Sequence, residues 1–181
     1  MSAPMRLAHV LASRHFDQLL LDLYGPQLMP TQRPVLVSQW SKYYFATLWQ
    51  TLLGAARLPV FADTAVVLDS RGLPTAFTGQ GRYCEGEDEV VSQHLEPLVQ
   101  HLATLGVVAP AVLWGNAGDC LDQVLHKAER DVGLRRLLTS PGSPLFAAVS
   151  LDAAGKRRRR TCCLSYKVDW VGHCEHCPLP G

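Results

Sequence analysis

The C-terminal segment constrains this chain most, because its last twenty residues hold four of the six cysteines. Cys162 and Cys163 are adjacent, and after ten further residues Cys174 and Cys177 follow as a Cys-x-x-Cys pair. One short loop can therefore bring four thiolates around one metal centre. The N-terminal apolar stretch is too short for a secretory signal. Clustered thiols in such a chain indicate metal binding or redox chemistry rather than a structural disulfide.

Three kinds of site compete for these thiols. A structural zinc site usually takes two Cys-x-x-Cys-like knuckles, whereas adjacent side chains of an extended segment point to opposite faces. An iron–sulfur cluster tolerates the adjacent pair better, and Cys177-Pro178 has the Cys-Pro form that ends some iron–sulfur ligand runs. A thioredoxin-like redox pair would need a helix after the Cys-x-x-Cys, which the following prolines do not favour. The spacing favours an iron–sulfur cluster, with zinc and a redox pair as alternatives.

Several stretches resemble the FhuF-like ferric-siderophore reductases. The most specific is residues 159–179, which read Arg-Arg-Thr-Cys-Cys-Leu-x-Tyr, then Cys-x-x-Cys-Pro-Leu after ten residues from the second cysteine. The run Ser-Gln-Trp-Ser-Lys-Tyr-Tyr-Phe at 38–45 and shorter stretches at 113–117 and 143–146 support it. The resemblance implies a [2Fe–2S] cluster on Cys162, Cys163, Cys174 and Cys177, and reduction of siderophore-bound iron in the cytoplasm.

We therefore expect an oxidoreductase that passes one electron from the cluster to Fe(III) in a siderophore, most simply one of hydroxamate type. Oxygen donors of this kind hold Fe(III) more tightly than Fe(II), so reduction releases the metal. The sequence has no dinucleotide fingerprint, so the electron is expected from a separate donor such as a ferredoxin or flavoprotein system. The alternatives are an iron–sulfur electron carrier without a chelate pocket and a zinc-stapled interaction domain.

Six further side chains are candidates for contact with substrate or donor. Arg159 and Arg160 end a basic run and are expected near the cluster, where positive charge favours reduction and attracts an acidic donor. A solvated surface is the alternative for this run. The candidates to line a pocket for a bulky chelate are Trp40, Tyr43 and Tyr44, with Lys42 beside them. Core packing is the alternative for the three aromatic residues.

Composition adds a few exclusions. The hydrophobic content of 48% and the charged content of 18% are typical of a globular protein. A net charge of +1 does not indicate a nucleic-acid partner. No apolar run is long enough to span a bilayer. We therefore expect a cytoplasmic protein with no membrane span.

The apolar periodicity predicts an α+β protein, a mainly helical single domain with short β-hairpins and a C-terminal iron–sulfur cluster loop. Residues 1–150 are expected to form the helical part with the chelate-binding face, and residues 151–181 a hairpin and cluster segment packed on the same domain. Helices are predicted at 5–24, 39–57 with Ser38 as cap, 88–106 with a kink at Pro97, 110–128 interrupted at Gly115-Asn116, and 134–138. Hairpins are predicted at 64–68 with 74–78, and at 146–151 with 160–168, the last strand carrying Cys162 and Cys163.

Overall fold

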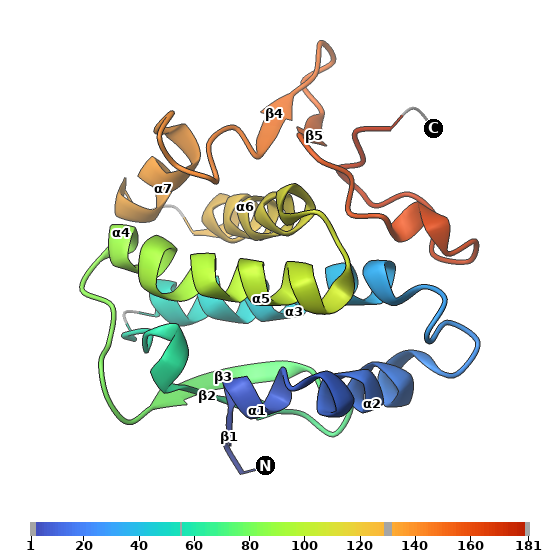
Figure 1. Cartoon of the computed structure of the whole chain (residues 1–181). Helices are drawn as coiled ribbons and strands as arrows, with labels where there is room; N and C mark the ends of the chain where they lie inside the picture. Colours follow the sequence, from blue (N-terminus) through green and yellow to red (C-terminus); the bar gives the residue numbers. More distant parts are fainter. Residues whose placement is uncertain (1–2, 55, 129–131, 180–181) are drawn as a thin grey trace.

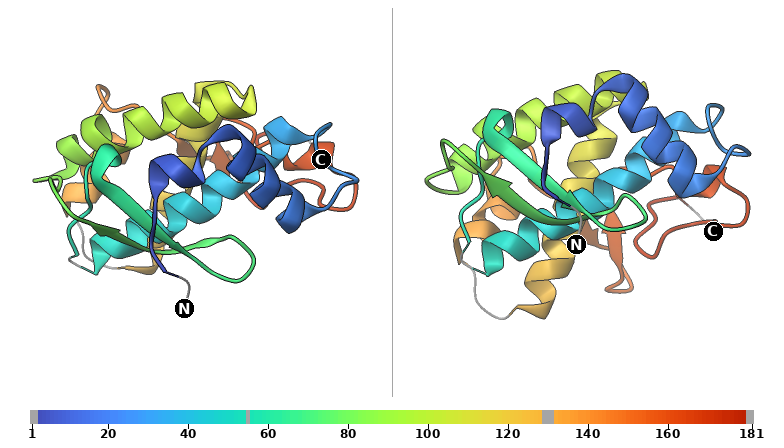
Figure 2. Two further views of the ribbon diagram at one scale, coloured as in Figure 1. Left: turned by 60° about the horizontal axis from the view of Figure 1, so that its bottom comes forward. Right: turned by 90° about the horizontal axis from the view of Figure 1, so that it is seen from below.

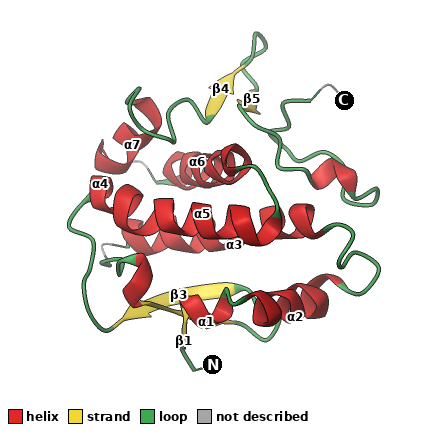
Figure 3. Ribbon diagram, in the orientation of Figure 1, coloured by secondary structure: helices red, strands yellow, loops and turns green. Residues whose placement is uncertain are grey.

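The protein is described by a computed structural model that covers residues 3–54, 56–128 and 132–179. These residues form one α+β domain in which helices dominate (Figure 3). A three-stranded antiparallel sheet has the order β1 (Met5–Arg6), β2 (Thr64–Leu68), β3 (Pro74–Gly79). The short helix α1 (Leu7–Val10) and α2 (Ser13–Tyr24) lie beside it (Figure 1). The predicted fold class and the hairpin of β2 and β3 are confirmed.

The long helix α3 (Arg33–Leu53) is the centre of the molecule, with the sheet on one side and α6 on the other (Figure 1). Viewed from the sheet side, the strands pass in front of it (Figure 2). Trp40 Nε1 donates to the carbonyl of Gly72 in the hairpin turn at 3.2 Å, and Trp49 Nε1 donates to Ala117 on α6 at 2.8 Å. The helix buries side chains towards both neighbours, among them Trp40, Tyr44, Phe45, Leu48 and Trp49.

The second helical layer follows the sheet in sequence. It begins with α4 (Glu87–Glu89), a π-helical turn (Val90–Leu95) and α5 (Glu96–Gly106), and continues with α6 (Pro110–Lys127) and α7 (Val132–Thr139). Pro97 lies directly after the π-helical turn, in a helical segment that continues from Glu87 to Gly106. The disturbance expected at this proline is therefore the π-helical turn that precedes it. Single 3-10 turns lie at Phe61–Asp63 and Ser165–Lys167.

Two predicted helix starts are wrong. Residues 5–24 do not form one helix, because Met5 and Arg6 pair with β2 as an edge strand. Helix α3 begins at Arg33 rather than at residue 39, because Pro34 occupies its first turn instead of breaking it. Ser38 is consequently a buried residue in the interior of the helix and not its cap.

The interruption predicted in α6 is also wrong, since the helix runs without a break through Gly115 and Asn116. Glycine serves a different purpose here. A Cβ atom on Gly115 would overlap the hydroxyl of Thr161, and one on Gly118 would overlap Ala148. The two glycines therefore let the C-terminal part of the chain approach the surface of α6.

The C-terminal hairpin consists of β4 (Val149–Leu151) and β5 (Arg157–Arg159), paired antiparallel. The predicted second strand at 160–168 is wrong, because the strand ends before the first cysteine pair. The amide of Arg159 bonds to the carbonyl of His176 at 2.8 Å. The final residues of the chain thus take the place beside β5, and Cys162 and Cys163 lie in the loop that follows. Among the described helices, none combines the length and apolar character needed to cross a bilayer.

Candidate metal centre and adjoining cleft

The loop after β5 and the last residues of the chain bring the four predicted thiols together. None of them forms a disulfide; Cys163 and Cys177 are buried, whereas Cys162 and Cys174 are partly exposed. A hydrogen bond between the thiols of Cys163 and Cys174 lowers the pKa of Cys163 and raises the pKa of Cys174. Burial raises the pKa of Cys162, and proximity to Cys163 and Cys177 raises it further. The four sulfurs therefore interact electrostatically as one group.

Hydrogen-bonding groups surround these sulfurs. Leu164 adopts a left-handed backbone conformation with φ of 67°, and its amide donates to Cys162 Sγ at 3.3 Å. Cys163 Sγ lies 3.4 Å from Ser165 Oγ, and His173 Nδ1 lies 3.1 Å from Cys177 Sγ. Hydrogen bonds to ligand sulfurs are among the features by which proteins tune iron–sulfur centres.

Within the described ranges, no three His, Cys, Asp or Glu side chains are already spaced to hold a single metal ion. What the structure brings together is a set of four soft thiols with polar neighbours. Soft thiolates are the ligands preferred by iron–sulfur clusters and by zinc. The residues present fit the cluster that the sequence predicts, by the chemistry of their donor atoms.

Side chains of helix α3 hold the cysteine loop through a main-chain carbonyl of the loop. Ser38 Oγ and Gln39 Nε2 both donate to the carbonyl oxygen of Cys163 at 2.8 Å. Asn116 on α6 supports this contact, because its Nδ2 donates to the Ser38 carbonyl at 2.9 Å and lies 3.0 Å from Ser38 Oγ. On the other side of the loop, Arg158 donates to the carbonyl of Cys177 at 2.8 Å. Main-chain carbonyls next to two of the thiols are thus fixed by neighbouring elements.

A buried charged network lies directly beneath this loop. The side chain of Arg159 has no exposed surface; its guanidinium contacts Asn116 Oδ1 and lies 3.5 Å from Asp119 Oδ2. Asp119 Oδ1 is 2.7 Å from His176 Nδ1. Arg159 also acts on the thiols, since its charge opposes the rise in the pKa of Cys162 and of Cys174. The structure therefore places Arg159 beside the thiols, inside the protein.

The basic run is only partly solvated in this structure, and each of its arginines has a protein partner. Arg157 forms an ion pair with Asp122 on α6 at 2.5 Å, and Arg158 forms one with Asp152 at 3.1 Å. The fourth arginine, Arg160, is exposed but donates to the carbonyl of Phe146 at 2.7 Å. The run fastens the hairpin and the cysteine loop to the helical layer.

A cleft of about 390 Å³ opens beside Cys174. This volume lies within the usual range of ligand pockets, about 300–1,000 Å³. Its walls come from α3, from α6 and from the C-terminal loop. Lys42 Nζ, in one wall, donates to Gln39 Oε1 at 3.1 Å. The lining residues are Gln39, Lys42, Tyr43, Ala46, Asp119, Cys120, Gln123, Cys174, Glu175 and His176.

Of the four pocket candidates on α3, the structure places Lys42 and Tyr43 at this cleft. Trp40 and Tyr44 have no exposed surface and lie on the opposite face of the helix. Tyr44 Oη is 2.7 Å from His94 Nε2 in the core. Tyr43, the third aromatic candidate, is 48% exposed and lines the cleft.

The fold and the site define an α+β protein, mainly helical, with four free thiols gathered in its C-terminal segment. Residues 159–179 match the family described as FhuF 2Fe-2S C-terminal domain, and residues 85–160 match that described as Ferric iron reductase FhuF-like transporter. Ferric siderophore reductase of Escherichia coli (strain K12) is 24% identical over 185 residues, covering 85% of this chain and 69% of that protein. The chain belongs to the FhuF-like family of ferric-siderophore reductases.

Proposed function

We propose that this protein is a cytoplasmic ferric-siderophore reductase that holds a [2Fe–2S] cluster on Cys162, Cys163, Cys174 and Cys177. One observation carries the proposal: Cys174 belongs to the interacting group of thiols and also lines an open cleft. A centre reached from such a cleft can exchange an electron with a metal ion that remains inside its own bulky chelate. The family match and the E. coli relative support the reductase class.

A bound [2Fe–2S] cluster exchanges one electron at a time, which is the number that converts one siderophore-bound Fe(III) to Fe(II). The chain's own residues hold the cysteine loop in position and balance the negative charge of its thiolates. Ser38 and Gln39 fix the backbone at Cys163, and the buried Arg159 offsets negative charge on the thiolates. Hydroxamate oxygens bind Fe(III) more tightly than Fe(II), so the reduced ion exchanges to other ligands.

The electron has to arrive from a separate protein, because the sequence lacks a dinucleotide fingerprint. We assign this role to a ferredoxin or flavoprotein donor. The attraction of the basic run for an acidic donor is reduced, because Arg157, Arg158 and Arg159 form ion pairs with acidic side chains of this chain. Association with the donor is therefore expected to depend only weakly on salt.

Anaerobically prepared protein tests the proposal in two stages. Absorption and electron paramagnetic resonance spectra, before and after dithionite, should show a red-brown two-iron centre that bleaches on reduction. The reduced protein, mixed with a ferric hydroxamate chelate and an Fe(II) trap, should then release iron faster than an equal amount of reduced ferredoxin. Colourless protein with bound zinc would overturn the cluster. Release no faster than with the ferredoxin would instead identify an electron carrier.

A further inference from the structure

We infer that an exposed apolar face of the cysteine loop is the docking surface for a ferredoxin that delivers the electron. This loop face consists of Tyr166, Trp170 and Val171. The inference rests on the proposed function and adds to it the place where the electron enters the protein. Its support comes from the exposure of these side chains, from their contacts towards the thiols, and from the charge and the size of the loop face.

Three large apolar side chains are exposed within six consecutive residues of the cysteine loop. Trp170 is 74% exposed, Val171 is 54% exposed and Tyr166 is 39% exposed. A single exposed apolar residue is normal, whereas a group of them marks an interaction site. Tryptophan and tyrosine are also enriched at protein interfaces. The other large exposed apolar side chains of the described residues lie singly on separate elements, namely Tyr43 on α3, Val107 after α5, Val132 on α7 and Leu151 on β4.

Backbone hydrogen bonds hold the loop face in place. The amides of Val171 and Gly172 both bond to the carbonyl of Val168, at 2.8 and 3.1 Å. Val168 is buried, so the turn that carries the exposed Trp170 is anchored to the protein. Ser165 Oγ donates to the Gly172 carbonyl at 2.9 Å and closes the segment. A partner that binds to an ordered turn of this kind loses little free energy to ordering the backbone.

Two short chains of contacts join the loop face to the thiols. The ring of Tyr166 lies beside that of His173, with 5.8 Å between the ring centroids, and His173 Nδ1 lies 3.1 Å from Cys177 Sγ. Ser165 Oγ, which closes the turn, lies 3.4 Å from Cys163 Sγ. A donor on the loop face is thus one or two side chains away from two of the proposed ligands. One electron leaves the ferredoxin, which is oxidised, and enters this protein, which is reduced; no bond forms or breaks.

The charges around the loop face nearly cancel. Between residues 164 and 176, the exposed charged side chains are Lys167, Asp169 and Glu175, one positive and two negative. Association is therefore driven by the apolar side chains more than by net charge, and it is expected to depend weakly on salt. The complementary partner is one whose surface is largely uncharged around its own redox centre.

The size of the loop face favours a transient encounter over a permanent dimer. A stable interface takes about 20–30 residues from each partner, whereas the loop face offers three apolar side chains with a few polar neighbours. Encounters between redox proteins lie at the low end of interface sizes. A ferredoxin also carries one electron at a time, which is the number that a two-iron centre accepts. These properties favour a ferredoxin over a second copy of this chain.

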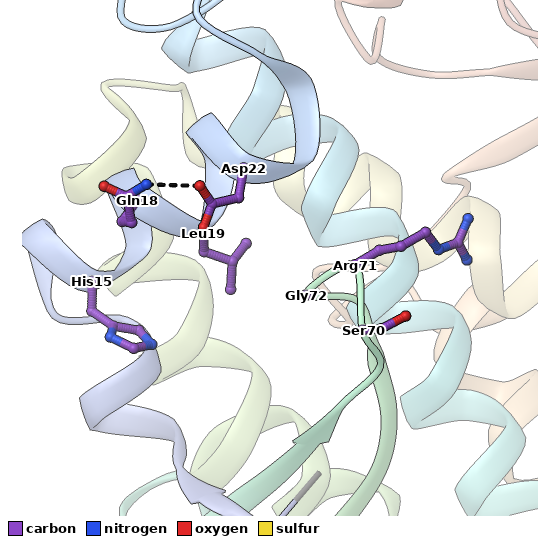
Figure 4. A pocket seen from close by; sticks show the side chains of 7 residues that line it. All are labelled: His15, Gln18, Leu19, Asp22, Ser70, Arg71 and Gly72. Carbon is purple, nitrogen blue, oxygen red and sulfur yellow. Dashed lines mark hydrogen bonds between the residues drawn. The ribbon is translucent and has the colours of Figure 1, made fainter. Parts of the chain in front are cut away.

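A hollow on the sheet side of α3 provides the contrast (Figure 4). It has a volume of about 240 Å³ and lies between α2 and the turn that joins β2 to β3. Gln18 and Asp22 in its lining bond to each other at 2.7 Å, and Arg71 is paired with Asp69 at 3.2 Å. None of the described residues that line it is a cysteine. Arg71→Ala is therefore a control for a surface change away from the thiols.

A second control matches the apolar character of the loop face. Val132 is 84% exposed at the start of α7, which lies on the other side of the molecule from the cysteine loop (Figure 1). Val132→Ser removes one exposed apolar side chain there. If general surface hydrophobicity attracts the donor, this change should act like one in the loop face.

The test measures binding and electron entry separately on the anaerobic cluster-loaded protein. Calorimetry gives the affinity for an oxidised [2Fe–2S] ferredoxin, and freeze-quenched electron paramagnetic resonance spectra give the rate at which the reduced ferredoxin passes on its electron. Trp170→Ser should weaken binding and slow electron entry by about tenfold each, and Trp170→Phe by less than about threefold. Val132→Ser and Arg71→Ala should change neither. Dithionite, a small reductant that needs no docking, should reduce all variants at the same rate.

Unchanged binding and electron entry in Trp170→Ser would overturn the inference. An equal slowing of the dithionite reaction would do so too, since the side chain would then support the loop rather than a partner. Faster entry from a reduced flavodoxin, lost in Trp170→Ser, would assign the loop face to a flavoprotein instead. A dimer that sedimentation detects in the wild type and not in Trp170→Ser would assign it to a second copy of this chain, and either result refutes the ferredoxin.

The outcome is separable from that of the proposed function. A protein that accepts electrons from ferredoxin through Trp170, but releases no Fe(II) from a ferric chelate, would retain the docking surface and refute the reductase. Rapid Fe(II) release after reduction by dithionite, with ferredoxin binding unaltered in Trp170→Ser, would do the reverse.

Discussion

Ser38 Oγ lies 2.8 Å from the carbonyl oxygen of Cys163, which joins two residues 125 positions apart in the chain. The serine is in the interior of α3, where its side chain bonds outward to the cysteine loop. Asn116 on α6 contacts the same serine, so the two central helices and the loop meet at one point. The placement of the thiols is thereby tied to the core of the domain rather than to the loop alone.

We predict that Ser38→Ala destabilises the protein by about 1–2 kcal/mol, because it leaves a buried carbonyl and a buried amide with fewer partners. The loop should also release its metal faster. Both effects can be measured, by urea unfolding and by the rate of bleaching in excess chelator. Ser92→Ala is the control, since Ser92 Oγ donates to Asp88 at an exposed position. Equal bleaching rates in the two variants would contradict the anchoring role of Ser38.

Arg159→Met should cost about 3–5 kcal/mol of folding free energy, because it leaves Asp119 buried without its cationic partner. Arg160→Met, one residue later at an exposed position, should cost less than about 1 kcal/mol. Urea unfolding of the two variants at one pH measures both losses of folding free energy. Similar losses in both would mean that the run acts as a whole and that the burial of Arg159 has no special weight.

Gly115→Ala should destabilise the protein by about 1–3 kcal/mol, although alanine is the better helix former, because the added methyl group overlaps Thr161. The second change Thr161→Ala should recover part of the loss, since it removes the hydroxyl that the new methyl group meets. Gly142→Ala is the control, as nothing lies within 4 Å of a Cβ atom there. Thermal unfolding of the single and double variants measures the coupling. Strictly additive effects would exclude the close approach.

Stability should decrease as the pH falls from about 7 to about 5, because His94 is neutral in the folded protein. Its Nδ1 donates to the Pro59 carbonyl and its Nε2 accepts from Tyr44, both at 2.7 Å. Burial lowers its pKa from 6.5 to about 4. The unfolded chain therefore binds a proton at His94 in this pH range, whereas the folded chain does not. The resulting loss of folding free energy is about 2 kcal/mol at pH 5. The free energy of unfolding measured along this range should vary less steeply in His94→Gln. An equally steep dependence in that variant would assign it to other groups.

Cys174→Ala should abolish the visible chromophore of the anaerobic protein, because it removes one of the four proposed ligands. Cys84→Ala should retain it, since Cys84 is a buried thiol outside the C-terminal loop. Absorption spectra with iron and sulfide analysis measure both. A full spectrum in Cys174→Ala would show that the centre uses a different set of ligands.

The proximity of the four cysteines could be predicted from the sequence because they are close together in the chain. Cys162 and Cys177 are separated by one short loop, and their types and spacing indicate metal binding or redox chemistry. The same holds for the hairpin of β2 and β3, whose turn residues are local signals. Predictions failed where the outcome depends on distant partners. Ser38 has the side chain of a typical helix cap, but Pro34 lies inside the first turn of α3, so the helix begins before Ser38.

Burial explains the remaining differences. The aromatic stripe of α3 is visible in the sequence, but only the packing of the sheet shows that Trp40 is covered and that Tyr43 is open. Four consecutive arginines are ordinarily exposed, and nothing local distinguishes Arg159. Its burial depends on Asn116 and Asp119, about forty residues earlier, which its guanidinium reaches only when β5 approaches α6.

The cysteine loop is secured through the backbone oxygens of Cys163, His176 and Cys177. A carbonyl is present whatever side chain a residue bears, so this anchorage does not depend on the exposed side chains of residues 164–172. Tyr166 and Trp170, which are 39% and 74% exposed, project from that segment. The outer face of the loop can therefore be redesigned for a new electron donor while the thiols keep their positions.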